Sequence, residues 1–396
     1  MPWLIGSLIF LLTAGFAKVS TVLLNRLLAF PQPKWLLGLT ELVQVSLIPI
    51  YAGLMTYGLS QQGLRFLIDE QAWNSQPPAL TILFVIGAVG LVLLIRSTIA
   101  YQFYRPPGCQ IAIDSQIIDF RQSRDGHSWR DMLVGPRPMR RVALLPGNEQ
   151  FSVEVSTKTF SLQGLPREWD GVSIVQLADT HFRGAVTRTW FEAVCQQAMA
   201  LKPDLFVFTG DLLDDLSQLD WLPETFGKLK APLGQYFILG NHDWYLDPTA
   251  IRQEFGRQGW IDLAGRSQKL VSPRAGPPIV IAGDETPWMG THPELDPGSI
   301  DFFHILLSHT PDNINWARDN GVDLMLAGHT HGGQIRLPLL GPVYSPSRFG
   351  CRFASGVFWL NPTLLYVSRG LSGREPIRFH CVPELTKLVL KSQQTK

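Results

Sequence analysis

Short polar clusters rich in aspartate, asparagine and histidine recur between residues 179 and 331 of this 396-residue chain. Each follows a short apolar run, and together they offer carboxylate, amide and imidazole groups without sulfur. The clusters read Asp179-Thr180-His181, Gly210-Asp211, Gly240-Asn241-His242-Asp243, Gly283-Asp284, Ser308-His309 and Gly328-His329-Thr330-His331. Mixed nitrogen and oxygen donors suit Mn²⁺, Fe or Zn²⁺ and disfavour a Ca²⁺ site, which is built from oxygen.

The number of candidate ligands indicates more than one metal ion. The candidates are Asp179, His181, Asp211, Asn241, His309, His329 and His331. Seven groups are too many for one tetrahedral zinc ion, so the sequence predicts two divalent metal ions that share a carboxylate. Two ions about 3.5–4 Å apart can activate a water molecule and stabilise both ends of an in-line displacement at phosphorus. Any one of these residues alone could be a helix cap or a core group, but the ordered set favours phosphoester hydrolysis.

The apolar runs before the clusters have the length of buried strands. They cover residues 172–178, 205–209, 236–239, 279–282, 303–307 and 324–327. Amphipathic stretches at 189–201 and 311–320 fall between them, so strands alternate with helices and predict a layered α/β fold. Ligands of such sheets bind outside the carboxyl ends of the strands. All the polar clusters occur at those ends, and we therefore expect them to converge on one site.

The ordered motifs resemble those of the calcineurin-like metallophosphoesterases over residues 165–390. The set comprises Asp179-Thr180-His181, Gly210-Asp211-Leu212-Leu213-Asp214, Gly240-Asn241-His242-Asp243, His309 and Gly328-His329-Thr330-His331. The extensions Gly332-Gly333-Gln334 and Val367-Ser368-Arg369-Gly370 resemble a membrane-associated bacterial branch that includes some UDP-2,3-diacylglucosamine hydrolases. The resemblance implies a β-sandwich flanked by helices and a metal-dependent phosphoric ester hydrolase.

The resemblance also implies a role for each motif residue. Asp179, His181 and His331 would bind the first metal, Asp211 would bridge both ions, and Asn241, His309 and His329 would complete the second. His242 would contact the phosphate and protonate the leaving oxygen, so His242 and Asp211 are the expected catalytic residues. Asp214 and Asp243 would orient the ligands. Arg183 follows the first motif and is either a contact to the substrate phosphate or a solvated side chain.

The amino-terminal part has a different composition. Residues 1–105 contain only 9 of the 67 charged residues. Residues 79–95 carry no charge, 35–59 carry one acid, and 2–17 carry none, so these three stretches predict transmembrane helices. Each could instead be a buried core helix, and 2–17 could be a cleavable signal peptide. The basic residues of the first loop and those after the third span predict an inner-membrane protein with a cytoplasmic catalytic domain, which a cleaved signal would reverse.

These observations predict three regions: two or three transmembrane helices at 1–105, a linker with a β-rich preamble at 106–164, and the catalytic domain at 165–396. A net charge of +1 argues against a nucleic-acid partner. The expected substrate is a phosphodiester or pyrophosphate, including lipid-linked ones such as UDP-2,3-diacylglucosamine, with loops 283–299 and 337–350 as candidate pocket walls. The alternatives are a phosphomonoesterase on the same metal site and a non-catalytic membrane sensor or scaffold.

Overall fold

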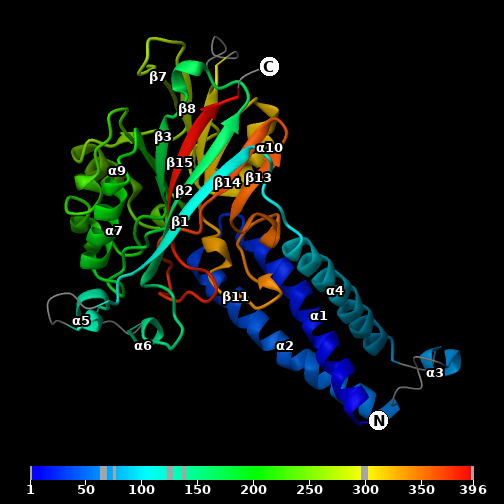
Figure 1. The fold of residues 1–396 in the computed structure, drawn as a ribbon. Coiled ribbons are helices and arrows are strands. Elements are labelled where there is room, and N and C mark those ends of the chain that lie inside the picture. The colour runs from blue at the N-terminus through cyan, green and yellow to red at the C-terminus, as the bar shows by residue number, and fades with distance from the viewer. Residues whose placement is uncertain are drawn as a thin grey trace. The chain divides into compact units, whose positions relative to one another are not determined.

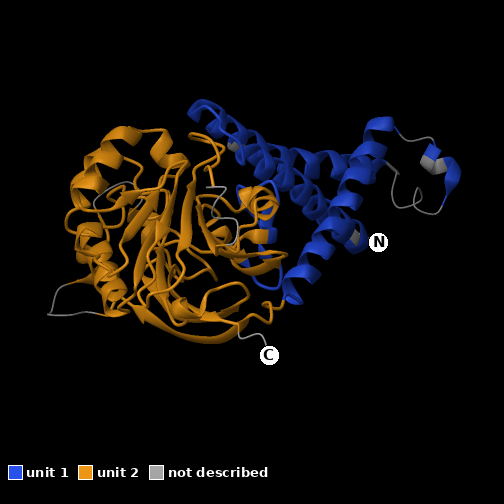
Figure 2. Ribbon diagram, turned by 90° about the horizontal axis from the view of Figure 1, so that it is seen from above, with its two compact units in different colours: residues 1–104, 337–352 blue, residues 105–336, 353–396 orange. Residues whose placement is uncertain are grey.

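The computed structural model describes residues 2–62, 69–74, 77–122, 128–135, 140–295 and 302–393. The chain divides into two compact units (Figure 2). Unit 1 comprises residues 1–104 and 337–352, and unit 2 comprises residues 105–336 and 353–396. The chain therefore passes between the two units three times.

Unit 1 is built from long apolar helices. They are α1 (Pro2–Leu28), α2 (Lys34–Gln62) and α4 (Pro78–Gln102), with a short α3 (Glu70–Asn74) before the last. All three long helices have the length and apolar composition needed to cross a membrane, as the sequence predicted. All three extend beyond the predicted segments, and two of them continue through a basic residue, α1 through Lys18 and α4 through Arg96. Lysine and arginine favour the helix, and their long side chains can reach a membrane surface.

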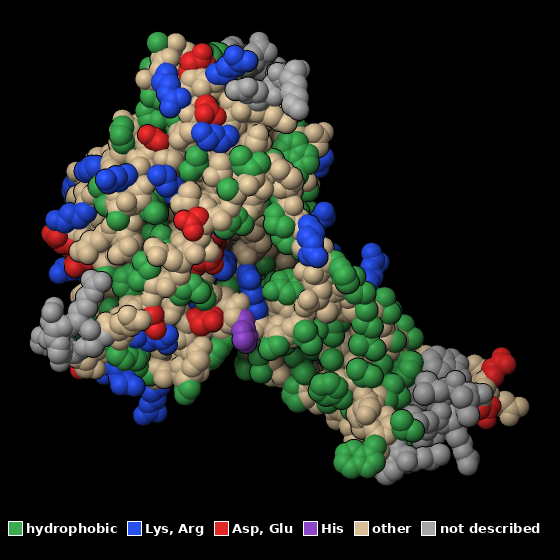
Figure 3. Space-filling model, in the orientation of Figure 1, with side chains coloured by type: hydrophobic (Ala, Val, Ile, Leu, Met, Phe, Trp, Pro, Cys, Tyr) green, Lys and Arg blue, Asp and Glu red, His purple; other side chains and the backbone are tan. Residues whose placement is uncertain are grey.

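The surface of these helices shows whether they are membrane-spanning helices or buried core helices. Large apolar side chains face outward, among them Trp35 (70% exposed), Val45 (70%) and Val92 (57%). Figure 3 shows hydrophobic side chains covering the helical part, whereas charged side chains are scattered over the remainder of the visible face. A soluble protein rarely exposes so large an apolar surface, so a membrane environment is favoured over a protein core.

Small residues allow α1 and α4 to pack closely. A Cβ atom at Gly90 of α4 would lie 1.9 Å from the carbonyl oxygen of Gly15 in α1, and one at Gly15 would lie 2.0 Å from the carbonyl oxygen of Gly87. Tyr51 of α2 donates a hydrogen bond to the carbonyl of Leu83 in α4. Close backbone approach at small residues is typical of helix pairs within membranes.

Replacing Gly90 by leucine is expected to lower the stability of the detergent-solubilised protein by about 1–3 kcal/mol, because the added side chain overpacks this contact. The measurement is thermal unfolding of the purified variant. Gly53→Leu in α2 is the matched control, because within the described residues a Cβ at Gly53 has no heavy atom within 4 Å. Equal destabilisation of the two variants would contradict the close packing of α1 on α4.

Unit 2 contains two mixed β-sheets (Figure 1). The seven-stranded sheet has the order β1-β2-β15-β3-β4-β5-β6 and the six-stranded sheet the order β13-β14-β10-β9-β8-β7. The strands are β1 (Gln110–Asp119), β2 (Ser152–Leu162), β3 (Ser173–Leu177), β4 (Leu205–Thr209), β5 (Gln235–Ile238), β6 (Ile261–Asp262), β7 (Ser267–Leu270), β8 (Ile279–Asp284), β9 (His304–Ser308), β10 (Leu324–Ala327), β13 (Gly356–Leu360), β14 (Thr363–Val367) and β15 (Glu384–Ser392). A further pair, β11 (Arg336–Leu337) with β12 (Gly341–Pro342), spans the boundary to unit 1.

Helices cover the outer faces of the two sheets. In Figure 1, α7 and α9 lie on one side of the sheets and α10 on the other. The helices are α5 (Trp129–Leu133), α6 (Arg140–Ala143), α7 (Arg188–Ala200), α8 (Asn241–Trp244), α9 (Pro248–Arg257) and α10 (Ile314–Asp319), with 3₁₀ turns η2 (Arg167–Trp169), η3 (Leu216–Trp221), η4 (Phe226–Lys228), η6 (Pro311–Asn313), η7 (His331–Gly333) and η8 (Gly350–Phe353). The stretch 311–320, expected as one amphipathic helix, begins with the turn η6 and continues as α10.

Alternating side chains of the strands form two cores. Ile174, Val207 and Ile238 of the first sheet share a cluster with Ile305 and Leu326 of the second, so the sheets pack face to face. The neighbouring residues on the same strands of the first sheet point to a second cluster shared with α7 and α9. Because successive side chains of a strand point to opposite faces, a fully apolar run serves both cores. The predicted layered α/β sandwich flanked by helices is confirmed.

The strands of the region predicted as a preamble belong to this sandwich. β1 pairs with β2, and β2 pairs in parallel with β15, so residues from 110 onward continue the seven-stranded sheet. The boundaries drawn at 105 and 164 stay predictions, and contacts place residue 105 at the start of unit 2.

Candidate metal centre

The predicted ligands occur in loops that follow parallel strands. Strands β3, β4 and β5 run parallel in one sheet, and β8, β9, β10 and β14 run parallel in the other. The loops after β3, β4, β5, β9 and β10 carry all seven predicted ligands. Five of these residues have left-handed backbone angles, with φ between 46° and 69°: Asp179, His181, Asp211, His329 and His331. Such angles are uncommon outside glycine and gather at functional sites.

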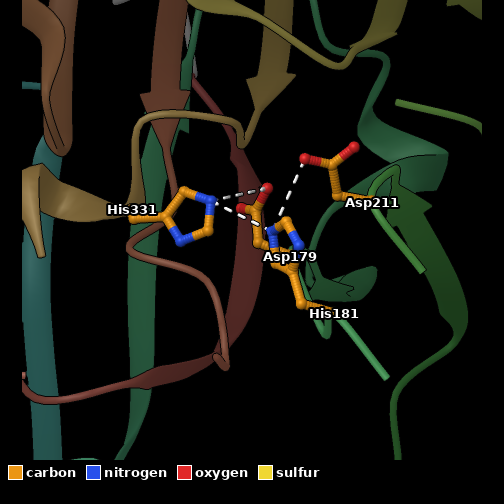
Figure 4. Close-up of side chains that lie close together, drawn as sticks. All are labelled: Asp179, His181, Asp211 and His331. Atoms are coloured by element: carbon orange, nitrogen blue, oxygen red, sulfur yellow. Dashed lines mark hydrogen bonds and ion pairs between the residues drawn. The ribbon is translucent and has the colours of Figure 1, made fainter. Parts of the chain in front are cut away.

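The first group of donors contains Asp179, His181, Asp211 and His331, whose side chains point toward one another (Figure 4). One ligand atom from each lies within 4.8 Å of the others. Nε2 of His181 and Nε2 of His331 are 3.1 Å apart, and Nε2 of His181 is 3.5 Å from Oδ2 of Asp211. All four side chains are buried or largely buried.

A second group meets the first at Asp211. Asp211, His309 and His329 also bring one donor atom each within 4.8 Å. Nε2 of His309 is 3.4 Å from Oδ2 of Asp211, 3.1 Å from Nδ1 of His329 and 2.9 Å from Oδ1 of Asn241. The structure therefore gathers all seven predicted ligands into two groups with one carboxylate in common.

The buried carboxylate of Asp211 tests whether metal ions fit this arrangement. Its Oδ1 accepts a hydrogen bond from the backbone N–H of His242, but its Oδ2 has no hydrogen-bond partner among the described residues. The nitrogens Nε2 of His309 and of His181 lie 3.4 and 3.5 Å from this oxygen without a hydrogen bond to it. A buried carboxylate oxygen without a hydrogen bond is costly, and cations between the two groups would stabilise it. Two divalent cations fit the donor set, which combines imidazole nitrogens with carboxylate and amide oxygens.

Backbone carbonyls set the proton positions on two of the histidines. Nδ1 of His331 lies 2.9 Å from the carbonyl oxygen of Ser372, and Nδ1 of His309 lies 2.8 Å from that of Thr209. Because a carbonyl only accepts hydrogen bonds, each Nδ1 is assigned the proton, and in a neutral ring Nε2 then presents its lone pair to the cluster. This is the usual way in which an outer contact orients a metal-binding imidazole.

Asp214 joins two histidines next to the first donor group. Its Oδ1 contacts Nδ1 of His242 in a short hydrogen bond and lies 3.3 Å from Nδ1 of His181. Burial would raise the pKa of Asp214, but the two histidines hold it well below its usual range. For His242, burial would lower the pKa, and attraction to Asp211 and Asp214 outweighs this and raises it to about 9. The direction of this shift favours the protonated imidazole of His242 beside the cluster.

The other predicted site residues lie further out. The fully buried carboxylate of Asp243 accepts hydrogen bonds from the backbone N–H groups of Asp211, Leu212 and Gly240, which ties the loops after β4 and β5 together. Arg183 is exposed, and its guanidinium donates to the carbonyl of Arg374. The contact of Arg183 with a substrate phosphate stays a prediction.

One polar cluster at a strand end has a different use. Asp284 is the last residue of β8, and its carboxylate accepts hydrogen bonds from Thr286 and contacts Nδ1 of His292 at 2.8 Å. It therefore stabilises the turn after β8.

Arg378 is a supporting residue that sequence reasoning missed. Its side chain is fully buried and donates to the carbonyl oxygens of His331, Arg369 and Ser372. The carbonyl of Ser372 is also the partner of Nδ1 of His331, so Arg378 fixes both the backbone and the ring of this predicted ligand. No motif marks Arg378, because its partners are backbone carbonyls, which every residue type has.

Replacing Arg378 by methionine is expected to weaken metal binding by about 10–100-fold, the usual effect of losing an outer contact to a ligand. Arg378→Lys should restore part of the affinity because it keeps a charged donor. The measurement is Mn²⁺ titration of metal-stripped protein, with the folded state checked by circular dichroism. Arg374→Met is the matched control, since Arg374 is exposed. Unchanged Mn²⁺ affinity in folded Arg378→Met would contradict the positioning role.

Comparison with known proteins agrees with this architecture and donor set. The profile of the calcineurin-like phosphoesterase family matches residues 172–333, which contain all seven predicted ligands. The metallophosphoesterase YkuE of Bacillus subtilis is 34% identical over 260 residues, covering 62% of this chain and 87% of YkuE. The phosphodiesterase YaeI of Escherichia coli is 29% identical over 225 residues, covering 55% of this chain and 81% of YaeI.

The name of a third relative includes a substrate. The UDP-2,3-diacylglucosamine pyrophosphatase LpxG of Chlamydia muridarum is 27% identical over 275 residues, covering 54% of this chain and 82% of LpxG. Fold, site and relatives agree, and the chain belongs to the calcineurin-like metallophosphoesterases. It is an enzyme of the phosphoric ester hydrolase class, as the motifs predicted.

Proposed function

We propose that this protein is a membrane-anchored phosphoesterase that uses two divalent metal ions to hydrolyse a phosphodiester or pyrophosphate, with a lipid-linked substrate such as UDP-2,3-diacylglucosamine. The observation that carries the proposal is the buried Asp211, which belongs to both donor groups and whose Oδ2 has no hydrogen-bond partner among the described residues. The named activities of YaeI and LpxG support the diester and pyrophosphate classes. The three apolar helices support a substrate that resides in a membrane.

Each residue has a proposed task. Asp179, His181 and His331 would hold one ion, Asn241, His309 and His329 the other, and Asp211 both. Bound ions would activate a water molecule and neutralise charge on the phosphoryl oxygens. His242, oriented by Asp214, would donate a proton to the leaving oxygen. Mn²⁺, Zn²⁺ and Fe all suit the donor set.

The test is a rate panel with the purified full-length protein. The substrates are p-nitrophenyl phosphate, bis-p-nitrophenyl phosphate and UDP-2,3-diacylglucosamine, each with Mn²⁺, Zn²⁺ or Mg²⁺. We expect release of UMP from the lipid and cleavage of the diester, both faster than cleavage of the monoester. A monoester rate far above the other two would favour the phosphomonoesterase alternative. Failure to cleave the diester and the UDP-lipid with any metal would refute the proposal.

We also propose that the helices lie in a bacterial inner membrane with unit 2 in the cytoplasm. Arg26 and Lys34 flank the first loop, Arg96 lies near the end of α4 and Arg105 follows that helix, so this side carries more basic residues than the second loop, which has Arg65. Reporter fusions test the sidedness: a fluorescent protein after residue 396 should fluoresce and a periplasmic phosphatase there should be inactive. The opposite pattern would reverse the orientation.

A further inference from the structure

The segment 337–352 begins six residues after His331 but clusters with α1, α2 and α4 in unit 1. The sequence suggested residues 337–350 as a pocket wall. Within unit 1, these residues contact the carboxyl-terminal ends of α1 and α4. These contacts suggest a different role for the segment.

The end of α1 holds the second half of the segment. The buried side chain of Asn25 accepts a hydrogen bond from the backbone N–H of Ser345 at 3.2 Å, and its Nδ2 lies 3.9 Å from Sγ of Cys351. The guanidinium of Arg348 lies over the ring of Phe30, 5.9 Å from its centroid.

The end of α4 holds the first half. Nε2 of Gln102 donates to the carbonyl oxygen of Leu339 at 2.5 Å. Gly341 lies so close to Tyr101 that an added Cβ atom would come within 2.7 Å of its ring, and the φ of Gly341 is 73°. The segment is therefore fixed to both helices.

Both of these helix ends belong to one side of the membrane. If α1, α2 and α4 each cross once, the carboxyl ends of α1 and α4 emerge on the same side because α2 runs back between them. Trp35 lies in the first turn of α2 there, Tyr101 lies in the last turn of α4, and Tyr104 follows that helix. Aromatic residues at helix ends are typical of the boundary between lipid and water. Segment 337–352 is thus fixed at a membrane surface.

The segment presents apolar side chains at this boundary. Leu339 is 77% exposed, Leu337 is 44% exposed and Tyr344 is 38% exposed, and the cationic Arg348 and Arg352 are also exposed. Apolar side chains next to basic ones are characteristic of surfaces that bind in the headgroup region of a bilayer.

We propose that segment 337–352 is a bilayer-contact surface whose Leu337, Leu339 and Tyr344 insert at the boundary between headgroups and acyl chains. A role of this surface in substrate delivery rests on the proposed function, because the contact would bring lipid-linked phosphoesters to the metal centre. Along the chain, six residues lead from His331, a predicted ligand, to Leu337, a length that spans at most about 20 Å.

Fluorescence quenching tests the contact itself. A Leu339→Cys variant is labelled with an environment-sensitive fluorophore and placed in phospholipid vesicles. Some of the lipids in these vesicles carry a nitroxide quencher near the headgroup. Val271→Cys is the matched control because Val271 is 82% exposed in unit 2, and labelled wild-type protein gives the background from the four native cysteines. We expect quenching at position 339 and little at 271. Equal quenching at both positions, or none at 339, would overturn the proposal.

A rate comparison tests the use of the surface. The double variant Leu337→Ser/Leu339→Ser is expected to lose about tenfold or more of its rate on UDP-2,3-diacylglucosamine in vesicles, because two apolar contacts with lipid are removed. Its rate on water-soluble bis-p-nitrophenyl phosphate should not change. Equal losses on both substrates would overturn the delivery role. If wild-type protein cleaves neither substrate, the proposed function fails, while the quenching result still decides whether the segment touches lipid.

Discussion

The variant Asp211→Asn is expected to lose nearly all phosphodiesterase activity. Asp211 is the only residue shared by the two donor groups, and its carboxylate is buried with Oδ2 unpaired among the described residues. An amide lacks the charge that would offset two cations and can present only one oxygen. Metal ions contribute several kcal/mol to stabilising such a transition state, so the rate should fall by about 10³-fold or more.

Two measurements separate this effect from unfolding. Bound Mn²⁺, determined by elemental analysis after gel filtration, should fall together with the rate on bis-p-nitrophenyl phosphate, while circular dichroism stays unchanged. Asp220→Asn is the matched control, because Asp220 is exposed in η3. Asp211→Asn protein that retains both its metal and its rate would remove Asp211 from the proposed centre.

His242→Ala is expected to lower the rate without removing the metal ions. In the proposal His242 is not a ligand, and Asp214 holds it as a proton donor through a short hydrogen bond. Loss of a positioned acid usually lowers rates by about 10²–10⁴-fold. The loss should be small for bis-p-nitrophenyl phosphate, whose leaving group needs little protonation, and large for a glycerophosphodiester with an alkoxide leaving group.

The ratio of the rate losses on the two diesters distinguishes proton donation by His242 from other roles. A purely structural role for His242 would lower both rates equally, and a ligand role would also lower the Mn²⁺ content. His380→Gln is the matched control, because His380 is exposed in unit 2. Equal losses on the two diesters would contradict proton donation by His242.

Much of the site was predictable because its chemistry resides in side chains. Asp179, Asp211 and His309 each follow an apolar run, and parallel strands bring the ends of such runs to one edge of a sheet. The alternation of strands and helices likewise predicted the layered fold. The three apolar helices were visible from composition alone.

The unpredicted parts depend on backbone groups and on long-range contacts. Arg378 donates hydrogen bonds to the carbonyl oxygens of residues far apart in the chain. Every residue type has a carbonyl group, so no sequence motif identifies these contacts. Segment 337–352 looks like an ordinary loop in the sequence, because its assignment to unit 1 depends on single contacts such as Asn25 with Ser345. The runs 110–120 and 151–162 of the β-rich preamble look strand-like in the sequence, but their partners were not predictable from nearby sequence.

The position of β15 has a consequence for how the protein is made. This strand ends at Ser392, four residues before the end of the chain, yet it lies between β2 and β3 in the seven-stranded sheet. During translation, β2 emerges more than two hundred residues before the strand that joins it to β3. The edges of β2 and β3 that pair with β15 stay open until residues 384–392 have been synthesised, long after α1, α2 and α4. Pairing of β15 is therefore a late step in forming the catalytic fold, and a chain that stopped before residue 384 would leave these two edges open.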